Sequence, residues 1–363
     1  MPTDETLGQA AAVVEQFIQA GAMPGAAVLV GRRDRIVLER GLGHLSSRDD
    51  APLVTSETIY DLASLTKVLV TTTLAMLFNE RGLLDLDAPV KDHIAEFHGD
   101  GKDQVRIKDL LAHCGGLVRW TDLYKQFEGR APDEAKREYL QAICEMPLDC
   151  PPRTQTVYSD LGFLLLGEIV ERIGKEPLDI LAKVCIFEPL GMSETTFRPG
   201  RSDNIAPTEE DEWRGRVVQG EVHDENAFGL GGVAPHAGVF STARGLAPFP
   251  RMLLGVGIGG DKPLLNARII KRFTCRASLV SGSSRALGWD TPSDTSSCGH
   301  YFSASSFGHT GFTGTSLWID PEQDVFVILL TNRVYPTRDN QKIAALRPAF
   351  HDAVMTALGV TTS

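Results

Sequence analysis

The stretch DLASLTKVLVTTTLAMLFNE, residues 61–80, combines a candidate nucleophile with the start of a helix. Apolar residues recur at helical spacing from Val68 to Glu80, and a spacing of three places Ser64 and Lys67 on one face. A serine hydroxyl becomes a good nucleophile when a neighbouring base takes its proton, and a lysine whose pKa falls below about 10.4 can be that base. The free N–H groups of a helix start also suit an oxyanion. An ordinary helix start beside a solvated lysine is the structural alternative.

Two further polar segments could complete such a site. Tyr158-Ser159-Asp160 directly precedes an apolar helix predicted from Leu161, so Asp160 is expected as the N-cap. The Tyr158 phenol could relay protons between the nucleophile and a leaving group, although a buried core tyrosine fits equally well. His309-Thr310-Gly311 precedes a strand predicted from about Thr313. A sheet edge can line a cleft there, and an ordinary turn into a strand is the alternative.

Strand and helix patterns outside these segments indicate the fold class. Apolar runs flanking short polar turns predict one hairpin near each end of the chain, and the middle of the chain has mostly helical periodicity. We therefore expect an α/β (α+β) fold with an antiparallel sheet flanked by helices, built from both chain ends, and an inserted, mostly helical domain. One predicted hairpin pairs 26–31 with 35–43, and the other pairs 314–320 with 325–332. The predicted sheet domain is 1–66 with 230–363, and the predicted helical domain is 67–229.

Length, composition and charge exclude several classes of protein. A chain of 363 residues exceeds the usual length of one domain, and 42% hydrophobic with 23% charged residues is typical of a globular protein. The formal charge of −11 disfavours nucleic acid or an anionic membrane as partner. Apolar runs stay below the roughly 18 residues of a membrane span, and the first residues lack the charge of a secretory signal. The expected location is the cytoplasm.

The sequence offers no motif for a metal or an organic cofactor. Nine histidines include no H-E-x-x-H, and six cysteines form no C-x-x-C pair. The G-x-S-x-G turn of an α/β-hydrolase is also absent. We therefore expect no cofactor and no metal, and a small-molecule ester, amide or β-lactam as the partner.

Ser64-x-x-Lys67, Tyr158-Ser159-Asp160 and His309-Thr310-Gly311, in this order, resemble the three motifs of the serine β-lactamase and penicillin-binding-protein superfamily. The class C β-lactamase-like branch, with its D-Ala-D-Ala carboxypeptidases and family VIII esterases, is the most similar. RIKDLLAHCGGL (106–117) and GGVAPHAGVFSTARGLA (231–247) resemble two more of its segments. The resemblance implies that Ser64 is acylated and that Lys67 and Tyr158 share proton transfer. It also implies an oxyanion hole from the Ser64 and Phe312 N–H groups, and substrate contacts from Asp160, His309, Thr310 and Gly311.

Two departures from that pattern concern the substrate. Asp160 stands where the β-lactamases of this branch have Asn, and an ionised carboxylate can only accept a hydrogen bond from an acylamide. His309 stands where they have Lys, and a histidine is mostly neutral at pH 7, so it offers a substrate carboxylate no fixed cation. Both departures favour an esterase acting on small acyl esters. A D-amino-acid peptidase or D-Ala-D-Ala carboxypeptidase with weak β-lactamase activity is the alternative enzyme, and an inactive binding or scaffold protein is the alternative of another class.

Overall fold

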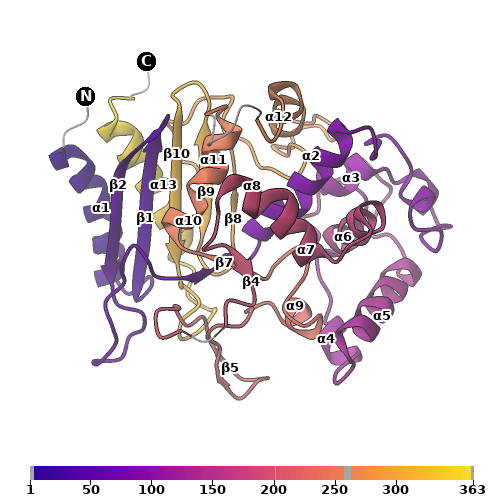
Figure 1. The fold of residues 1–363 in the computed structure, drawn as a ribbon, viewed down its shortest axis with the longest axis horizontal. Coiled ribbons are helices and arrows are strands. Elements are labelled where there is room, and N and C mark those ends of the chain that lie inside the picture. The colour runs from indigo at the N-terminus through magenta and orange to yellow at the C-terminus, as the bar shows by residue number, and fades with distance from the viewer. Residues whose placement is uncertain (1–3, 201, 257–262, 361–363) are drawn as a thin grey trace.

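A five-stranded antiparallel sheet joins the two ends of the chain. The structure, a computed structural model, describes residues 4–200, 202–256 and 263–360 (Figure 1). The strand order is β2-β1-β10-β9-β8, so the N-terminal hairpin pairs with the C-terminal one through β1 and β10. Both predicted hairpins and the predicted fold class are confirmed. The strands are β1 Gly25–Arg32, β2 Arg35–Gly43, β8 Phe307–Thr310, β9 Ser316–Asp320 and β10 Val325–Thr331.

The central strands bury both faces of this sheet. Alternate side chains of a strand point to opposite faces. In β1, Val28 and Val30 therefore join the core under helices α1 (Asp4–Gln19) and α13 (Ile343–Ala357), which cover one face. Ala27 and Leu29 join the larger core on the other face. This two-sided burial explains why β1 and β10 are nearly continuous runs of apolar residues.

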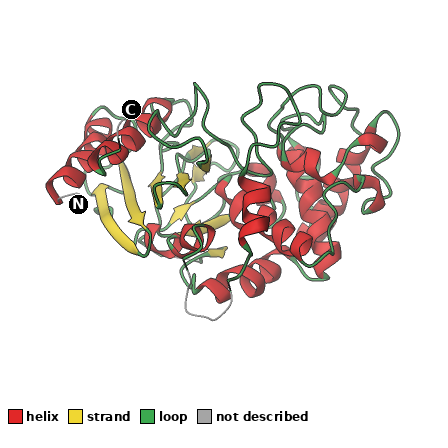
Figure 2. Cartoon of the chain, turned by 90° about the horizontal axis from the view of Figure 1, so that it is seen from above, coloured by secondary structure: helices red, strands yellow, loops and turns green. Residues whose placement is uncertain are grey.

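Helices are the main regular elements in the middle of the chain, as predicted, and they gather beside the sheet (Figure 2). A π-helical turn, Lys67–Thr72, leads into α2, and a second, Lys183–Phe187, leads into α8. Two 3-10 turns cover Val90–Asp92 and Lys102–Gln104. The helices are α2 Thr73–Glu80, α3 Ile107–Leu111, α4 Leu123–Gln126, α5 Pro132–Glu145, α6 Asp160–Gly174, α7 Leu178–Ala182, α8 Glu188–Leu190, α9 Glu225–Gly229, α10 Ala243–Leu246, α11 Pro248–Leu253 and α12 Ala267–Thr274.

Short strands fix the segments between the sheet and the helices. Strands β3 (Tyr60–Asp61), β7 (Val239–Ser241) and β4 (Thr196–Phe197) form a small sheet, and β5 (Glu210–Asp211) pairs with β6 (Arg216–Val217). β3 ends three residues before Ser64, α6 begins at Asp160, and β8 ends at Thr310. All three predicted motifs thus lie at the ends of elements. In the described part of the chain, no helix has both the length and the apolar character needed to cross a membrane.

Candidate active site

Lys67 lies beneath Ser64, and three oxygen atoms surround its ammonium nitrogen. Its side chain is fully buried, and its Nζ donates to Ser64 Oγ at 2.9 Å and to the carbonyl oxygen of His236 at 3.2 Å. The third neighbour is Asp160, whose Oδ1 lies 2.6 Å from the same nitrogen. Two hydrogen bonds and one ion pair therefore hold the ammonium group in place.

The charges around Lys67 keep it protonated. Burial lowers the pKa of Lys67, but the negative charge and hydrogen bond of Asp160, with a further contribution from Tyr158, outweigh burial and raise this pKa above its ordinary value. The sequence left open whether Lys67 is a neutral base or an ammonium ion. The environment of the buried group favours the ammonium ion.

The second motif differs from the prediction at its helix start. Ser159, not Asp160, is the N-cap of α6, because its Oγ accepts the Gly162 N–H at 3.2 Å. Asp160 is the first residue of the helix and is directed to Lys67 instead. Both residue types cap helices well, so the local sequence could not distinguish them. The ion pair with Lys67 decided which one caps.

Tyr158 packs between two imidazole rings beside Lys67. Its ring centre lies 4.4 Å from that of His113, 5.9 Å from that of His309 and 5.0 Å from Lys67 Nζ. His113 Nδ1 accepts the Ser159 N–H at 3.0 Å, which fixes the loop before α6. These contacts hold the phenol close to the ammonium group.

The third motif lies within a strand and the turn after it. His309 and Thr310 end β8, whereas the sequence placed them before a strand. The reason is that strand pairing reaches further than the apolar run: His309 pairs with Leu317 and Thr310 with Ser316. Burial, together with the charges of Arg285 and Lys67, holds the pKa of His309 well below its usual range. His309 is therefore neutral at pH 7, as expected.

The turn from Gly311 to Thr315 is fastened to the segment before Ser64. Thr313 Oγ1 donates to the Asp61 carbonyl oxygen at 2.8 Å, and Thr315 Oγ1 donates to that of Leu62 at 3.0 Å. A Cβ on Gly311 would lie 2.5 Å from the Leu62 carbonyl oxygen, so this close approach requires glycine.

Backbone geometry on the Ser64 side is also held by side chains. Ala63 has φ of 46°, a left-handed conformation that costs a non-glycine residue about 1–2 kcal/mol. Asp61 Oδ1 supports it by accepting the Ala63 N–H at 2.8 Å. The N–H groups of Ser64 and Phe312 donate to no other residue in the described ranges. Both are therefore available to a substrate oxygen.

A cavity of about 490 Å³ brings most of the predicted residues together. Ser64, Tyr158, Asp160, Thr310, Gly311 and Phe312 line it, whereas Lys67 is buried beneath it. His309 lines a neighbouring hollow of about 430 Å³, which Tyr158 and Thr310 share. Trp120, which the sequence left open as a core residue or a cleft wall, also lines the Ser64 cavity. No local pattern marks several other residues that line it: Arg119, His223, Asp224, Glu225, Arg333, Arg338 and Arg347.

Contacts between carboxylates and basic side chains surround this cavity. The Glu209 carboxylate lies 2.7 Å from His223 Nε2 and also accepts hydrogen bonds from Arg338, and these contacts overcome burial and lower its pKa to about 2. Asp224 Oδ1 lies 2.9 Å from Nε2 of His236, the residue whose carbonyl oxygen holds Lys67. Burial alone would raise the pKa of Asp224, but His236 holds it well below the usual range.

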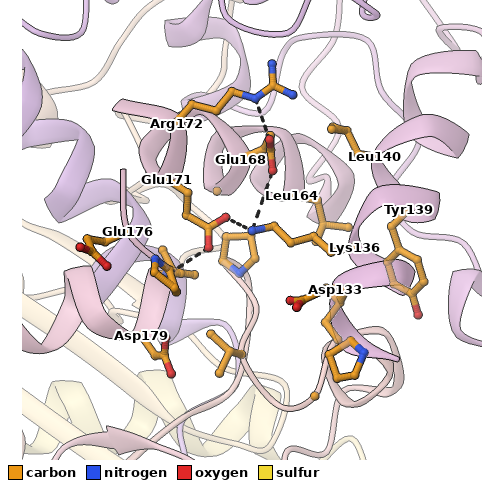
Figure 3. Close-up of a pocket in the computed structure, with 18 of the residues that line it drawn as sticks. Asp133, Lys136, Tyr139, Leu140, Leu164, Glu168, Glu171, Arg172, Glu176 and Asp179 are labelled. Atoms are coloured by element: carbon orange, nitrogen blue, oxygen red, sulfur yellow. Dashed lines mark hydrogen bonds and ion pairs between the residues drawn. The ribbon is translucent and has the colours of Figure 1, made fainter. Parts of the chain in front are cut away.

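Another hollow, of about 620 Å³, lies between α5 and α6, away from the three motifs (Figure 3). Four of its charged side chains pair with one another: Lys136 contacts Glu171 and Glu168, and Arg172 Nε lies 2.6 Å from Glu168. Among the described residues, no three His, Cys, Asp or Glu side chains gather closely enough to hold a metal ion. The Ser64 cavity is therefore the candidate active site.

Comparisons with known proteins agree with this fold. The family model described as Beta-lactamase matches residues 10–350. A protein of Escherichia coli O157:H7 named "Putative D-alanyl-D-alanine carboxypeptidase" is 32% identical over 371 residues, which cover 93% of this chain and 85% of that protein. The structure of EstCE1, a hydrolase with promiscuous acyltransferase activity, has a TM-score of 0.76 at 21% identity and covers 97% of this chain and 99% of its own. The structure of a class C β-lactamase from Rhodobacter sphaeroides has a TM-score of 0.71 at 23% identity and covers 96% of this chain and 99% of its own.

Proposed function

The chain belongs to the β-lactamase family of serine hydrolases, and we propose that it hydrolyses small acyl esters through an acyl-Ser64 intermediate. The observation that carries the proposal is the contact between Ser64 Oγ and the buried Lys67 ammonium at 2.9 Å, in a cavity that Tyr158 also lines. A serine placed beside a fixed cation and a phenol can form and release an acyl group.

In this mechanism Tyr158 moves the proton and Lys67 supplies charge. Asp160 keeps Lys67 protonated, so the ammonium stabilises negative charge on Ser64 Oγ, 2.9 Å away, and on the oxygen of the neighbouring Tyr158. In this step Tyr158 acts as a phenolate paired with the Lys67 ammonium. Ser64 Oγ attacks the ester carbonyl carbon while its proton passes to the phenolate oxygen, which becomes a phenol. The Tyr158 phenol then gives this proton to the leaving alkoxide oxygen, which departs as the alcohol. In the second half, water gives a proton to the Tyr158 phenolate and attacks the acyl carbon, and Tyr158 returns the proton to Ser64 Oγ as the acid is released.

The free N–H groups of Ser64 and Phe312 would bind the oxyanion. The turn carrying Phe312 is hydrogen-bonded to the segment before Ser64, so both donors are fixed before substrate binds. Preorganised donors of this kind lower the barrier because they need not reorient as charge develops.

The preference for esters is supported by Asp160. Its carboxylate is engaged with Lys67 and offers no amide donor to an acylamide carbonyl, so an amide or β-lactam substrate lacks a hydrogen bond that a simple ester does not need. Neutral His309 adds no cation from the third motif.

A second candidate function is D-Ala-D-Ala carboxypeptidase activity, with weak β-lactam hydrolysis. It is supported by the name of the 32% identical relative and by Arg347, which lines the Ser64 cavity. Burial lowers the pKa of Arg347 to about 9, so this side chain still carries charge at pH 7 and could attract a substrate carboxylate.

Comparing three substrates on one preparation tests both candidates. We expect kcat/KM for p-nitrophenyl butyrate to exceed the values for D-alanyl-D-alanine and nitrocefin. Ser64→Ala should abolish turnover and labelling by a fluorophosphonate while leaving the melting temperature within a few degrees. Ser193→Ala, at an exposed serine outside the site, is the matched control and should behave as wild type.

Each other outcome changes the assignment. Faster release of D-alanine than of p-nitrophenol would establish the second candidate. Full activity in Ser64→Ala would exclude Ser64 as the nucleophile. Absence of both labelling and turnover in the wild type would favour the binding or scaffold protein.

A further inference from the structure

Two large aromatic side chains are exposed where the substrate must enter. Trp120 is 41% exposed and Phe312 is 47% exposed, and both line the cavity that contains Ser64. Leaving apolar surface in water is unfavourable by about 25 cal/mol per Å². Covering exposed aromatic rings at the wall of a cavity with an apolar group therefore stabilises the complex.

Phe312 is held in a fixed orientation by Arg333 and His223. The Arg333 guanidinium lies 4.4 Å from the centre of its ring, and the ring of His223 stacks on it with centres 5.6 Å apart and planes 22° apart. Arg333 Nε also donates to the Phe312 carbonyl oxygen at 2.8 Å. Both the ring and its backbone are thus ordered before a ligand arrives.

Trp120 is supported by a series of aromatic contacts. Its ring centre lies 6.2 Å from that of Tyr124, which packs edge to face against Trp213 at 4.6 Å. Asn226 fastens the same loop: its Oδ1 accepts the Tyr124 N–H at 3.0 Å, and its Nδ2 donates to the Thr121 carbonyl oxygen at 2.8 Å. A preordered surface of this kind binds with a smaller loss of conformational entropy.

The position of Tyr158 indicates which part of the substrate meets these rings. Tyr158 and Thr310 line both the Ser64 cavity and the neighbouring hollow that contains His309. Of these two cavities, Trp120 and Phe312 line only the one that contains Ser64. In the proposed mechanism the Tyr158 phenol protonates the oxygen of the leaving group, so the alcohol portion of the ester lies on the Tyr158 side. The acyl group is then left on the side of the two aromatic rings.

We propose that Trp120 and Phe312 bind the acyl group and select aryl or medium-length alkyl acyl groups over acetyl. This inference rests on the proposed acyl-Ser64 mechanism and adds the substrate class. Trp120 and Phe312 act as specificity residues through their side chains. The Phe312 N–H retains its separate part in binding the oxyanion.

The test is the ratio of kcat/KM for p-nitrophenyl octanoate to that for p-nitrophenyl acetate. The ratio should fall about tenfold in Trp120→Ala and in Phe312→Ala, because each variant loses apolar contact with the longer chain only. Trp120→Phe and Phe312→Leu should retain most of it. Leu83→Ala, which removes a 55% exposed side chain outside the cavity, is the control and should keep the wild-type ratio.

A binding measurement separates this inference from the proposed esterase activity. Boronic acids bond reversibly to a serine oxygen, so calorimetry with methylboronic and octylboronic acid needs no turnover. The inference is supported if the wild type binds octylboronic acid more tightly than methylboronic acid and both alanine variants lose this difference. This holds even if no ester is hydrolysed. Equal affinity for the two acids in the wild type, or an octanoate-to-acetate ratio unchanged in both alanine variants, would overturn it.

Discussion

Asp160 determines the charge state of the residue beneath the nucleophile. Its Oδ1 lies 2.6 Å from Lys67 Nζ, and it is the main neighbour that raises the pKa of Lys67 against the opposing effect of burial. Asp160→Asn removes the negative charge and keeps the size of the side chain. Without that charge, burial dominates and Lys67 loses its proton at a lower pH.

We therefore predict that Asp160→Asn moves the alkaline limb of the kcat/KM profile to lower pH by at least about one unit. Activity requires the ammonium form of Lys67 in the proposed mechanism, so activity is lost at a lower pH when Lys67 is deprotonated at a lower pH. The measurement is hydrolysis of p-nitrophenyl butyrate from pH 6 to 11, with the rate of p-nitrophenol release corrected for spontaneous hydrolysis of the ester. Asp294→Asn, in the neighbouring hollow, is the control. An unmoved limb in Asp160→Asn would mean that Lys67 charge does not limit the reaction.

At the scale of elements, the turn between β8 and β9 is aligned by two threonine hydroxyls. Thr313 and Thr315 are both buried and donate to carbonyl oxygens in the segment that leads from β3 to Ser64. We predict that Thr315→Val, which keeps the shape and removes the hydroxyl, lowers kcat roughly tenfold and leaves KM nearly unchanged. The physical reason is that the oxyanion contact forms in the transition state, so misalignment mainly affects the chemical step.

Thr291→Val supplies a matched control for this loss. Thr291 is also buried, and its hydroxyl donates to the Ser284 carbonyl oxygen at 2.6 Å, away from the Ser64 segment. Each variant should lose about 1 kcal/mol of stability, and only Thr315→Val should lose kcat. Equal loss of kcat in the two variants would attribute the effect to general destabilisation.

For the whole molecule, the larger core joins the sheet to the helices. Leu29 and Ile328 of the sheet belong to the same buried cluster as Leu165 and Ile169 of α6. The division into a sheet domain (1–66 and 230–363) and a helical domain (67–229) stays a prediction, and the shared core bears on its stability. Separating the two parts would expose this core, so we expect neither to unfold alone.

We predict a single unfolding transition in urea. Hydrogen exchange read by mass spectrometry should show that peptides from α6 and from β10 lose protection at the same urea concentration. If the molecule is one cooperative unit, α6 and β10 exchange only through global unfolding and share one urea midpoint. Loss of protection in α6 at a lower concentration, while β10 remains protected, would show that the helical part is an independent folding unit.

The sequence by itself determined the local elements and the residues that carry the proposed chemistry. Apolar periodicity predicted both hairpins and the helical middle, because alternation and helical spacing are properties of neighbouring residues. The spacing of Ser64 and Lys67 fixed their contact within one turn. The order of the three motifs then gave the family resemblance and the fold class.

Only the tertiary structure decided the cap of α6, the charge of Lys67 and the residues that surround the site. Ser159 rather than Asp160 caps α6, and Lys67 is an ammonium ion, because Asp160 meets Lys67 across 93 positions of the chain. Trp120, Arg333 and Arg347 reach the cavity from loops and a helix that no local pattern links to Ser64. Charge state and cavity shape depend on contacts between distant segments, and such contacts exist only once the chain has folded.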